Sequence, residues 1–321
     1  MNSQILVLGA TNVDIVGEVV TLPDYGQCTF GKKVELLCGG SGLNTFWGLS
    51  RLEISSRFIS KIGEDFFGNF IINELKKRNI DFSSIIVSSE YPTGAVFCAI
   101  TESERTFFAF RKDAADIHIL QKDIKHIDLS AKFAFIDGVS IVEGKETYKT
   151  FLNVVKKLKQ AGTKIFYDPN IRKFNNEISS RIIEMIKYTD VLLPENSELK
   201  MIMHNDSEIN NIKDILDIGP KEIWLKLGNN GSKYISTNRT VIFPSLKVRA
   251  VDTTGAGDAY NACIIRGYLK NEHFKSIGTK ANIYAGLSTT KKGGSTRFPD
   301  LTTLIESKKE YLQILKEVKE L

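Results

Sequence analysis

The stretch Asp252-Thr253-Thr254-Gly255-Ala256-Gly257-Asp258 stands directly before the apolar run of residues 259–265. The run predicts a helix, and the small residues at its start leave the first backbone amides open to an anion, which the helix dipole also attracts. Asp258 falls in the first turn and faces the same space. Such amides beside a proton-accepting carboxylate suit phosphoryl transfer to a hydroxyl group. On this segment alone, a glycine-rich turn whose aspartate caps the helix is the simpler interpretation.

The rest of the chain alternates short apolar runs with amphipathic helical patterns. Residues 67–78 and 148–160 each place their apolar side chains on one helical face. The apolar runs are typical of strands buried on both faces. They occupy residues 5–8, 133–136, 164–167, 191–193 and 223–227. Strands that alternate with helices predict an α/β fold, and we expect a doubly wound, mainly parallel sheet in a single body spanning residues 1–321.

Two segments break this alternation. Residues 16–37 contain Pro23, Gly26 and Gly31 between β-rich pieces. Residues 93–111 alternate in hydrophobicity around a charged, hairpin-like turn at Glu102, Glu104 and Arg105. We expect antiparallel strands that form a small β-sheet lid, which would exclude water when closed. Residues 304–321 predict one amphipathic helix at the end of the chain.

Composition excludes several classes of protein. The 321 residues are 42% hydrophobic and 25% charged, as in an ordinary globular chain. Lys and Arg number 43 against 38 Asp and Glu, and this net charge of +5 is spread without the basic run of a nucleic-acid-binding protein. No apolar stretch approaches the ~18 residues of a membrane span, and we expect no secretory signal. Four scattered cysteines and four histidines suggest neither disulfides nor a zinc site, so we expect a cytoplasmic protein.

Five motifs in order along the chain resemble those of the ribokinase-like (PfkB) carbohydrate kinase family. All seven positions of 252–258 fit that family's C-terminal signature. The other four are Gly9-Ala10-Thr11-Asn12-Val13-Asp14, Gly39-Gly40-Ser41-Gly42-Leu43-Asn44, Leu227-Gly228-Asn229-Asn230-Gly231-Ser232, and Ala281-Asn282 with the later Gly293-Gly294 and Pro299. The resemblance implies an ATP-dependent kinase that uses Mg²⁺ and phosphorylates a small sugar. It also implies that the lid can pair between subunits, so a homodimer is a further expectation.

The resemblance assigns roles to residues of this sequence. Asp258 would be the general base, and the amides of Gly255, Ala256 and Gly257 would form the anion hole. Asp252 belongs to a loop that binds a monovalent cation in some members, which raises the question of activation by K⁺. The sugar would be held by Asp14, Gly39, Gly40 and Asn44, and the nucleotide would lie against Gly228, Gly231 and Asn282.

Two positions depart from the family pattern, and one motif is a decoy. Glu198 of Pro194-Glu195-Asn196-Ser197-Glu198 would organise Mg²⁺ through water, but Glu195 stands where asparagine is common. Lys226 replaces a frequent threonine beside the nucleotide, where it would pair with phosphate or be solvated. The segment 26–33 nearly spells a P-loop, but its last residue is a lysine and β-like residues follow instead of a helix, so we reject it.

The choice of acceptor stays open among several hydroxyl compounds. Phe108-Ala109-Phe110-Arg111 with Ala115-Asp116, and Asp168-Pro169-Asn170-Ile171-Arg172, are similar to segments of fructokinases and 2-keto-3-deoxygluconate kinases. There Arg111 and Arg172 would approach a substrate carboxylate, unless they pair structurally with Asp116 or Asp168. We therefore expect a ketose or keto sugar acid. A ribokinase or a nucleoside kinase for adenosine or pseudouridine, which residues 9–14 favour, and a non-catalytic sugar or nucleotide sensor are the alternatives.

Overall fold

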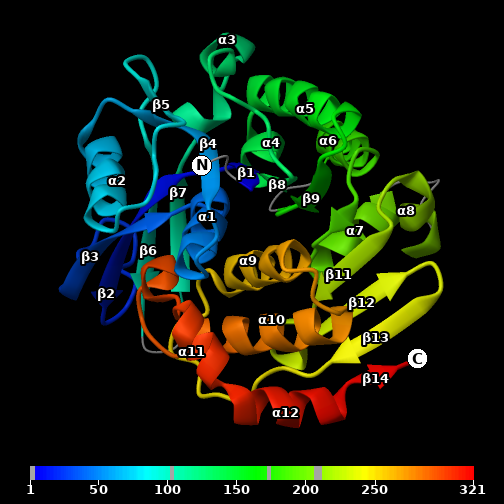
Figure 1. Cartoon of the computed structure of the whole chain (residues 1–321). Helices are drawn as coiled ribbons and strands as arrows, with labels where there is room; N and C mark the ends of the chain where they lie inside the picture. Colours follow the sequence, from blue (N-terminus) through cyan, green and yellow to red (C-terminus); the bar gives the residue numbers. More distant parts are fainter. Residues whose placement is uncertain (1–3, 102–104, 172–174, 206–211) are drawn as a thin grey trace.

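The computed structural model describes residues 4–101, 105–171, 175–205 and 212–321 (Figure 1). Within these ranges ten strands form a large sheet and four strands form a separate small sheet. The order across the large sheet is β14 (Lys319–Glu320), β13 (Arg239–Phe243), β12 (Ser232–Ser236), β11 (Glu222–Lys226), β10 (Val191–Leu192), β9 (Lys164–Asp168), β8 (Phe133–Asp137), β1 (Ile5–Leu8), β4 (Ser56–Gly63) and β5 (Ile85–Ser88). From β11 to β5 all neighbours are parallel, and β11 to β14 are antiparallel. The predicted α/β class and mainly parallel sheet are confirmed.

Helices cover both faces of the large sheet. Ile5 and Val7 of β1 contribute to one hydrophobic core, and Leu6 and Leu8 contribute to the other, which explains why the strand sequences are apolar throughout. One core is closed by α1 (Ser41–Arg51), α2 (Phe66–Lys77), α9 (Ala256–Leu269) and α10 (Phe274–Ser288). The other is closed by α3 (Gln121–Ile124), α4 (Val139–Glu143), α5 (Lys145–Gln160), α6 (Asn176–Ile186), α7 (Asn196–Asn205) and α8 (Ile212–Ile218). The sheet is therefore doubly wound, as predicted.

The C-terminal segment differs from the single helix that the sequence predicts. It forms α11 (Leu301–Glu306), α12 (Lys308–Glu317) and the short strand β14, which pairs with β13. The break falls at Ser307, whose backbone is not helical and whose hydroxyl donates to the carbonyl of Thr303. A serine that bonds its own backbone competes with helix formation, which a count of apolar positions does not detect.

The small sheet has the order β3 (Gly31–Gly39), β2 (Asn12–Val19), β6 (Gly94–Ile100) and β7 (Arg105–Phe110), and lies at the left of Figure 1. The prediction that its strands are antiparallel is wrong for the central pair, since β2 and β6 run parallel. The chain passes through β3, α1, β4, α2 and β5 between them, and a connection of that length permits parallel pairing. The rejected P-loop segment leads into β3 and not into a helix.

A short joint connects the last residue of β3 in the small sheet to the start of α1. β3 ends at Gly39 and α1 begins at Ser41, so Gly40 alone makes the turn, with φ at 95°. A Cβ atom on Gly40 would lie 2.5 Å from the carbonyl oxygen of Ala10, and one on Gly42 would lie 2.7 Å from Gly9. Only glycine permits this approach, which sets the start of α1 against the carboxyl end of β1.

Candidate active site

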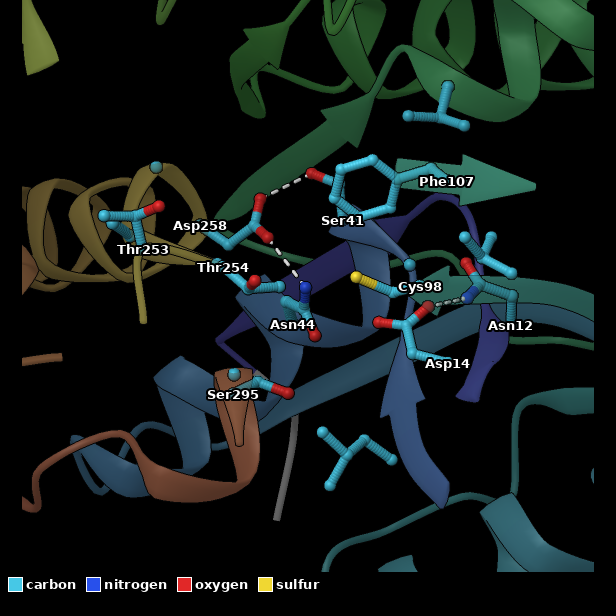
Figure 2. Close-up of a pocket in the computed structure, with 18 of the residues that line it drawn as sticks. Asn12, Asp14, Ser41, Asn44, Cys98, Phe107, Thr253, Thr254, Asp258 and Ser295 are labelled. Carbon is cyan, nitrogen blue, oxygen red and sulfur yellow. Dashed lines mark hydrogen bonds between the residues drawn. The ribbon is translucent and has the colours of Figure 1, made fainter. Parts of the chain in front are cut away.

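A cavity of about 480 Å³ opens between the small sheet and the carboxyl ends of the parallel strands. Alternate residues of the small sheet face it, Asp14 and Val16 from β2 and Cys98 from β6 among them. The starts of α1 and α9 form the opposite wall (Figure 2). In open α/β sheets ligands bind at this edge.

The start of α9 presents backbone amides to the cavity. Gly255 is the N-cap residue with φ at 77°, and no side chain caps the helix. The amide of Ala256 donates to the carbonyl of Thr253 at 3.2 Å, whereas those of Gly255 and Gly257 have no acceptor among the described residues. Two of the three predicted anion-hole amides are thus open, and the third is already engaged.

Asp258 lies buried in the first turn of α9 and points toward α1 (Figure 2). Its Oδ1 accepts from the Ser41 hydroxyl at 2.6 Å and its Oδ2 accepts from the Asn44 amide at 2.8 Å. Burial raises the pKa of Asp258 to about 7, although these two hydrogen bonds act in the opposite direction. A carboxylate with this pKa can accept a proton near neutral pH.

A chain of hydrogen bonds continues from Ser41 to a second buried carboxylate. Nδ2 of Asn170 donates to the Ser41 hydroxyl at 2.7 Å and to Oδ1 of Asp137 at 3.1 Å. Asp137 also accepts from the amides of Ala10, Gly42 and Val139. Burial raises the pKa of Asp137 to about 6, and the full set of donors fixes its orientation.

Asp168 and Lys226 form an ion pair on the cavity wall. Their side chains approach to 2.6 Å, and the Asn261 amide donates to the same carboxylate oxygen at 2.6 Å. Burial alone would lower the pKa of Lys226, but the negative charges of Asp168 and Glu198 outweigh it and raise the pKa. The alternative that Lys226 is solvated is therefore wrong. A Cβ atom on Gly257 would lie 3.8 Å from its Nζ, so the lysine adjoins the start of α9.

Asp252 is paired with the small sheet. It accepts from Arg105 of β7 at 2.9 Å and from the amides of Thr254 and Gly293, each at 3.0 Å. Burial would raise the pKa of Asp252, but these donors hold it below its ordinary value. The three donors hold both carboxylate oxygens in place, and the role of this loop in binding a monovalent cation stays a prediction.

Several predicted site residues lie outside the cavity wall. Gly39 lies behind Asp14, since a Cβ atom there would be 2.5 Å from that carboxylate. Glu198 accepts from the amides of Glu195 and Ile171, each at 2.7 Å, and burial raises its pKa to about 7; Glu195 itself reaches the cavity.

The residues predicted to contact the nucleotide also lie away from the cavity wall. Gly228 and Gly231 flank a short turn, with φ at 58° and 89°. Asn282 donates to Ser232 at 2.8 Å and to the carbonyl of Gly278 at 2.9 Å. Arg172 lies outside the described residues.

Some cavity residues were not assigned a role from sequence. Ser41 and Asn170 stand inside quoted motifs, but nothing in their spacing shows that Ser41 bonds Asp258 or that Asn170 bonds Ser41. Asp137 is fully buried behind the cavity wall, where it bonds Asn170; it ends β8, and the rule that ligands gather at the carboxyl ends of parallel strands could have drawn attention to it. Glu143 ends α4 and lines the cavity, and no signal in the sequence marks it.

Comparison with known proteins identifies the family of this chain. The family model described as "pfkB family carbohydrate kinase" matches residues 2–301, and the chain belongs to that family. The uncharacterized sugar kinase PH1459 of Pyrococcus horikoshii is 30% identical over 263 residues, covering 79% of this chain and 81% of that protein. Its structure in complex with ATP superimposes with a TM-score of 0.82 at 29% identity, covering 97% of this chain and 99% of the other.

Two further relatives carry the names of specific kinases. Fructokinase-1 of Zea mays is 28% identical over 275 residues, covering 81% of this chain and 85% of that protein. The 5-dehydro-2-deoxygluconokinase of Mesomycoplasma hyopneumoniae is 26% identical over 292 residues, covering 86% and 85%. Among the described residues, no helix has the length and apolar character that crossing a membrane requires.

Proposed function

We propose that this protein transfers the γ-phosphoryl group of ATP to a hydroxyl of a ketose or keto sugar acid, such as fructose or 2-keto-3-deoxygluconate. One observation carries the proposal: a buried carboxylate, Asp258, stands in the first turn of α9 beside open backbone amides and faces the cavity. The names of the relatives, which include a fructokinase and a kinase for a keto sugar acid, support this choice of acceptor.

In the proposed reaction Asp258 accepts the proton of the acceptor hydroxyl while the hydroxyl oxygen forms a bond to the γ-phosphorus of ATP. The bond between that phosphorus and the β–γ bridging oxygen breaks, and ADP leaves. With a pKa of about 7, Asp258 is ionised in a large fraction of molecules at neutral pH. The amides of Gly255 and Gly257 stabilise negative charge on the transferred group, and Lys226 adds a positive charge beside them. Asp14, Gly40 and Asn44 line the same cavity and hold the acceptor.

The residues present fit ATP with Mg²⁺. The described residues hold no cluster of three or more His, Cys, Asp or Glu side chains that would cage a metal. Mg²⁺ usually keeps waters and binds one or two carboxylates together with substrate phosphates. Asp168, whose buried Oδ1 has no partner among the described residues, and the cavity residue Glu195 suit that role, and Glu198 fixes the backbone of Glu195. When bound, the ion neutralises charge on the phosphates.

The small sheet would act as a lid within one body spanning residues 1–321, and as a dimer contact. Arg105 of β7 already joins it to Asp252 beside α9. On the face of β7 opposite the cavity, Phe108 and Phe110 are 46% and 67% exposed. Exposed aromatic side chains on the edge strand of a sheet are typical of a protein interface, which supports a homodimer formed through the lids.

Replacement of Asp258 by asparagine tests the catalytic proposal. ADP release should fall about 10²–10⁴-fold in Asp258→Asn, because the general base is lost while the fold remains. Asp81→Asn, which changes an exposed aspartate, is the matched control and should leave turnover unchanged. Near-normal turnover of Asp258→Asn would remove Asp258 from this role, and binding of sugar without ADP release by the wild type would favour a sensor.

A further inference from the structure

The guanidinium group of Arg111 is engaged at all three nitrogens. Nη2 donates to Asp116 at 2.7 Å, Nε donates to Glu143 at 2.8 Å, and Nη1 donates to Asn12 at 3.4 Å. Arg111 is itself 7% exposed, and its Nη1 is close enough to Gly94 that a Cβ atom there would lie 3.0 Å away. The side chain therefore cannot turn freely toward a new partner.

The two carboxylates around Arg111 differ in their access to the cavity. Asp116 is fully buried and also accepts from the Thr11 amide at 3.1 Å and the Ser140 hydroxyl at 3.2 Å. Glu143 lines the cavity with 32% of its side chain exposed. The backbone after it is fixed, because the amide of Gly144 donates to Ser140 and a Cβ atom on Gly144 would overlap Ile117.

The charges at this end of the cavity do not balance. One guanidinium faces the two carboxylates of Asp116 and Glu143, which leaves a net negative charge. The Asn12 amide, bonded to Arg111 through its oxygen, donates to Asp14 at 2.6 Å and so joins a third carboxylate to the cluster. Glu143 is more accessible to a ligand in the cavity than Arg111, since their side chains are 32% and 7% exposed.

We infer that Glu143 is a specificity-determining residue that makes this end of the acceptor site select a neutral sugar and reject a sugar acid. The inference rests on the proposed function and narrows its acceptor to the neutral ketose. All three nitrogens of Arg111 are engaged, so a substrate carboxylate would have to displace Glu143 to bind the guanidinium group. While Glu143 stays in place, its negative charge repels the substrate carboxylate. A sugar hydroxyl can instead donate to the Glu143 carboxylate, so a neutral acceptor meets no such penalty.

The test compares fructose with 2-keto-3-deoxygluconate, by ADP release and by calorimetric binding, in the wild type and three variants. Glu143→Gln removes the charge but keeps an oxygen for Arg111, and should shift the acid-to-ketose ratio of kcat/KM roughly tenfold toward the acid. Glu143→Asp keeps the charge and should retain the wild-type preference. Glu146→Gln changes an exposed glutamate on α5 and should leave the ratio unchanged.

The outcomes separate the inference from the proposed function. A wild type that prefers the acid, or a ratio that does not move in Glu143→Gln while turnover continues, overturns the role of Glu143 and leaves the kinase proposal standing. Selective binding of fructose that is lost in Glu143→Gln, without ADP release in any variant, supports Glu143 and contradicts the proposed function. Failure of the wild type to bind either compound overturns both.

Discussion

The hydroxyl of Ser41 donates to Oδ1 of Asp258 at 2.6 Å, and its oxygen accepts from Nδ2 of Asn170 at 2.7 Å. Because an amide nitrogen can only donate, the Ser41 proton must point at Asp258. This direction of the hydrogen bonds favours the ionised form of Asp258, which is the form that accepts a proton.

Replacement of Ser41 by alanine should move the pH dependence of turnover. Loss of a hydrogen bond to the charged form raises the pKa of Asp258 further, so the acidic limb of the kcat profile should shift up by about one pH unit. Turnover should fall several-fold at pH 7 and recover near pH 9. Ser180→Ala, at an exposed serine of α6, is the control. An unshifted limb would show that Ser41 does not tune the base.

Asp258 should lower the stability of the fold above neutral pH. Its pKa rises from an ordinary 3.8 to about 7 in the folded protein, so its contribution to stability is greatest below pH 4 and is lost as the pH rises through 7. At pH 8 Asp258→Asn should therefore be more stable than the wild type by about 1–3 kcal/mol. Thermal unfolding at pH 4 and pH 8 checks this, and an equal difference at both values would contradict it.

Loss of the ion pair between Lys226 and Asp168 should lower the stability of the fold and also weaken the binding of ATP. Lys226→Met leaves a buried carboxylate without its charged partner and should destabilise the protein by about 3–5 kcal/mol in urea unfolding. Adding Asp168→Asn should restore part of that loss, since the uncompensated charge disappears. Both variants should show a raised KM for ATP, and an unchanged KM would remove Lys226 from the phosphate site.

The exposed aromatic side chains of β7 predict a dimer contact, and one charged residue placed among them should disrupt that dimer. Phe110→Asp should convert the protein from dimer to monomer in sedimentation velocity, because it places a charge in the proposed contact. Leu312→Asp, at a 56% exposed leucine of α12, should leave the sedimentation coefficient unchanged. A monomeric wild type at micromolar concentration would contradict the dimer.

The elements of the main body could be predicted because their hydrophobic periods are local. The runs that became β1, β8 and β9 are apolar throughout because the sheet is covered on both faces. The parallel pairing of β2 with β6 could not be predicted, since it depends on contacts between segments about 80 residues apart in the sequence.

The candidate site could be predicted only as far as its motifs reach. The start of α9 and Asp258 were identifiable because small residues before a helix have a direct physical meaning. Glu143 was not, because it enters the cavity only where α4 ends beside Arg111. Asp252 matches the family signature by sequence, yet in the structure it forms an ion pair with Arg105, which lies 147 positions away in the sequence.

Gly40 connects β3 of the small sheet directly to α1, the helix whose Ser41 and Asn44 side chains bond the Asp258 carboxylate. If the small sheet moves as the proposed lid, we expect the movement to be passed through Gly40 to the helix that carries Ser41 and Asn44. Because Ser41 and Asn44 bond Asp258, arrival of the acceptor under the lid would then be coupled to the alignment of this carboxylate. We expect this coupling to protect the cell's nucleotide pool, because ATP bound without a sugar would meet a misaligned carboxylate and stay intact.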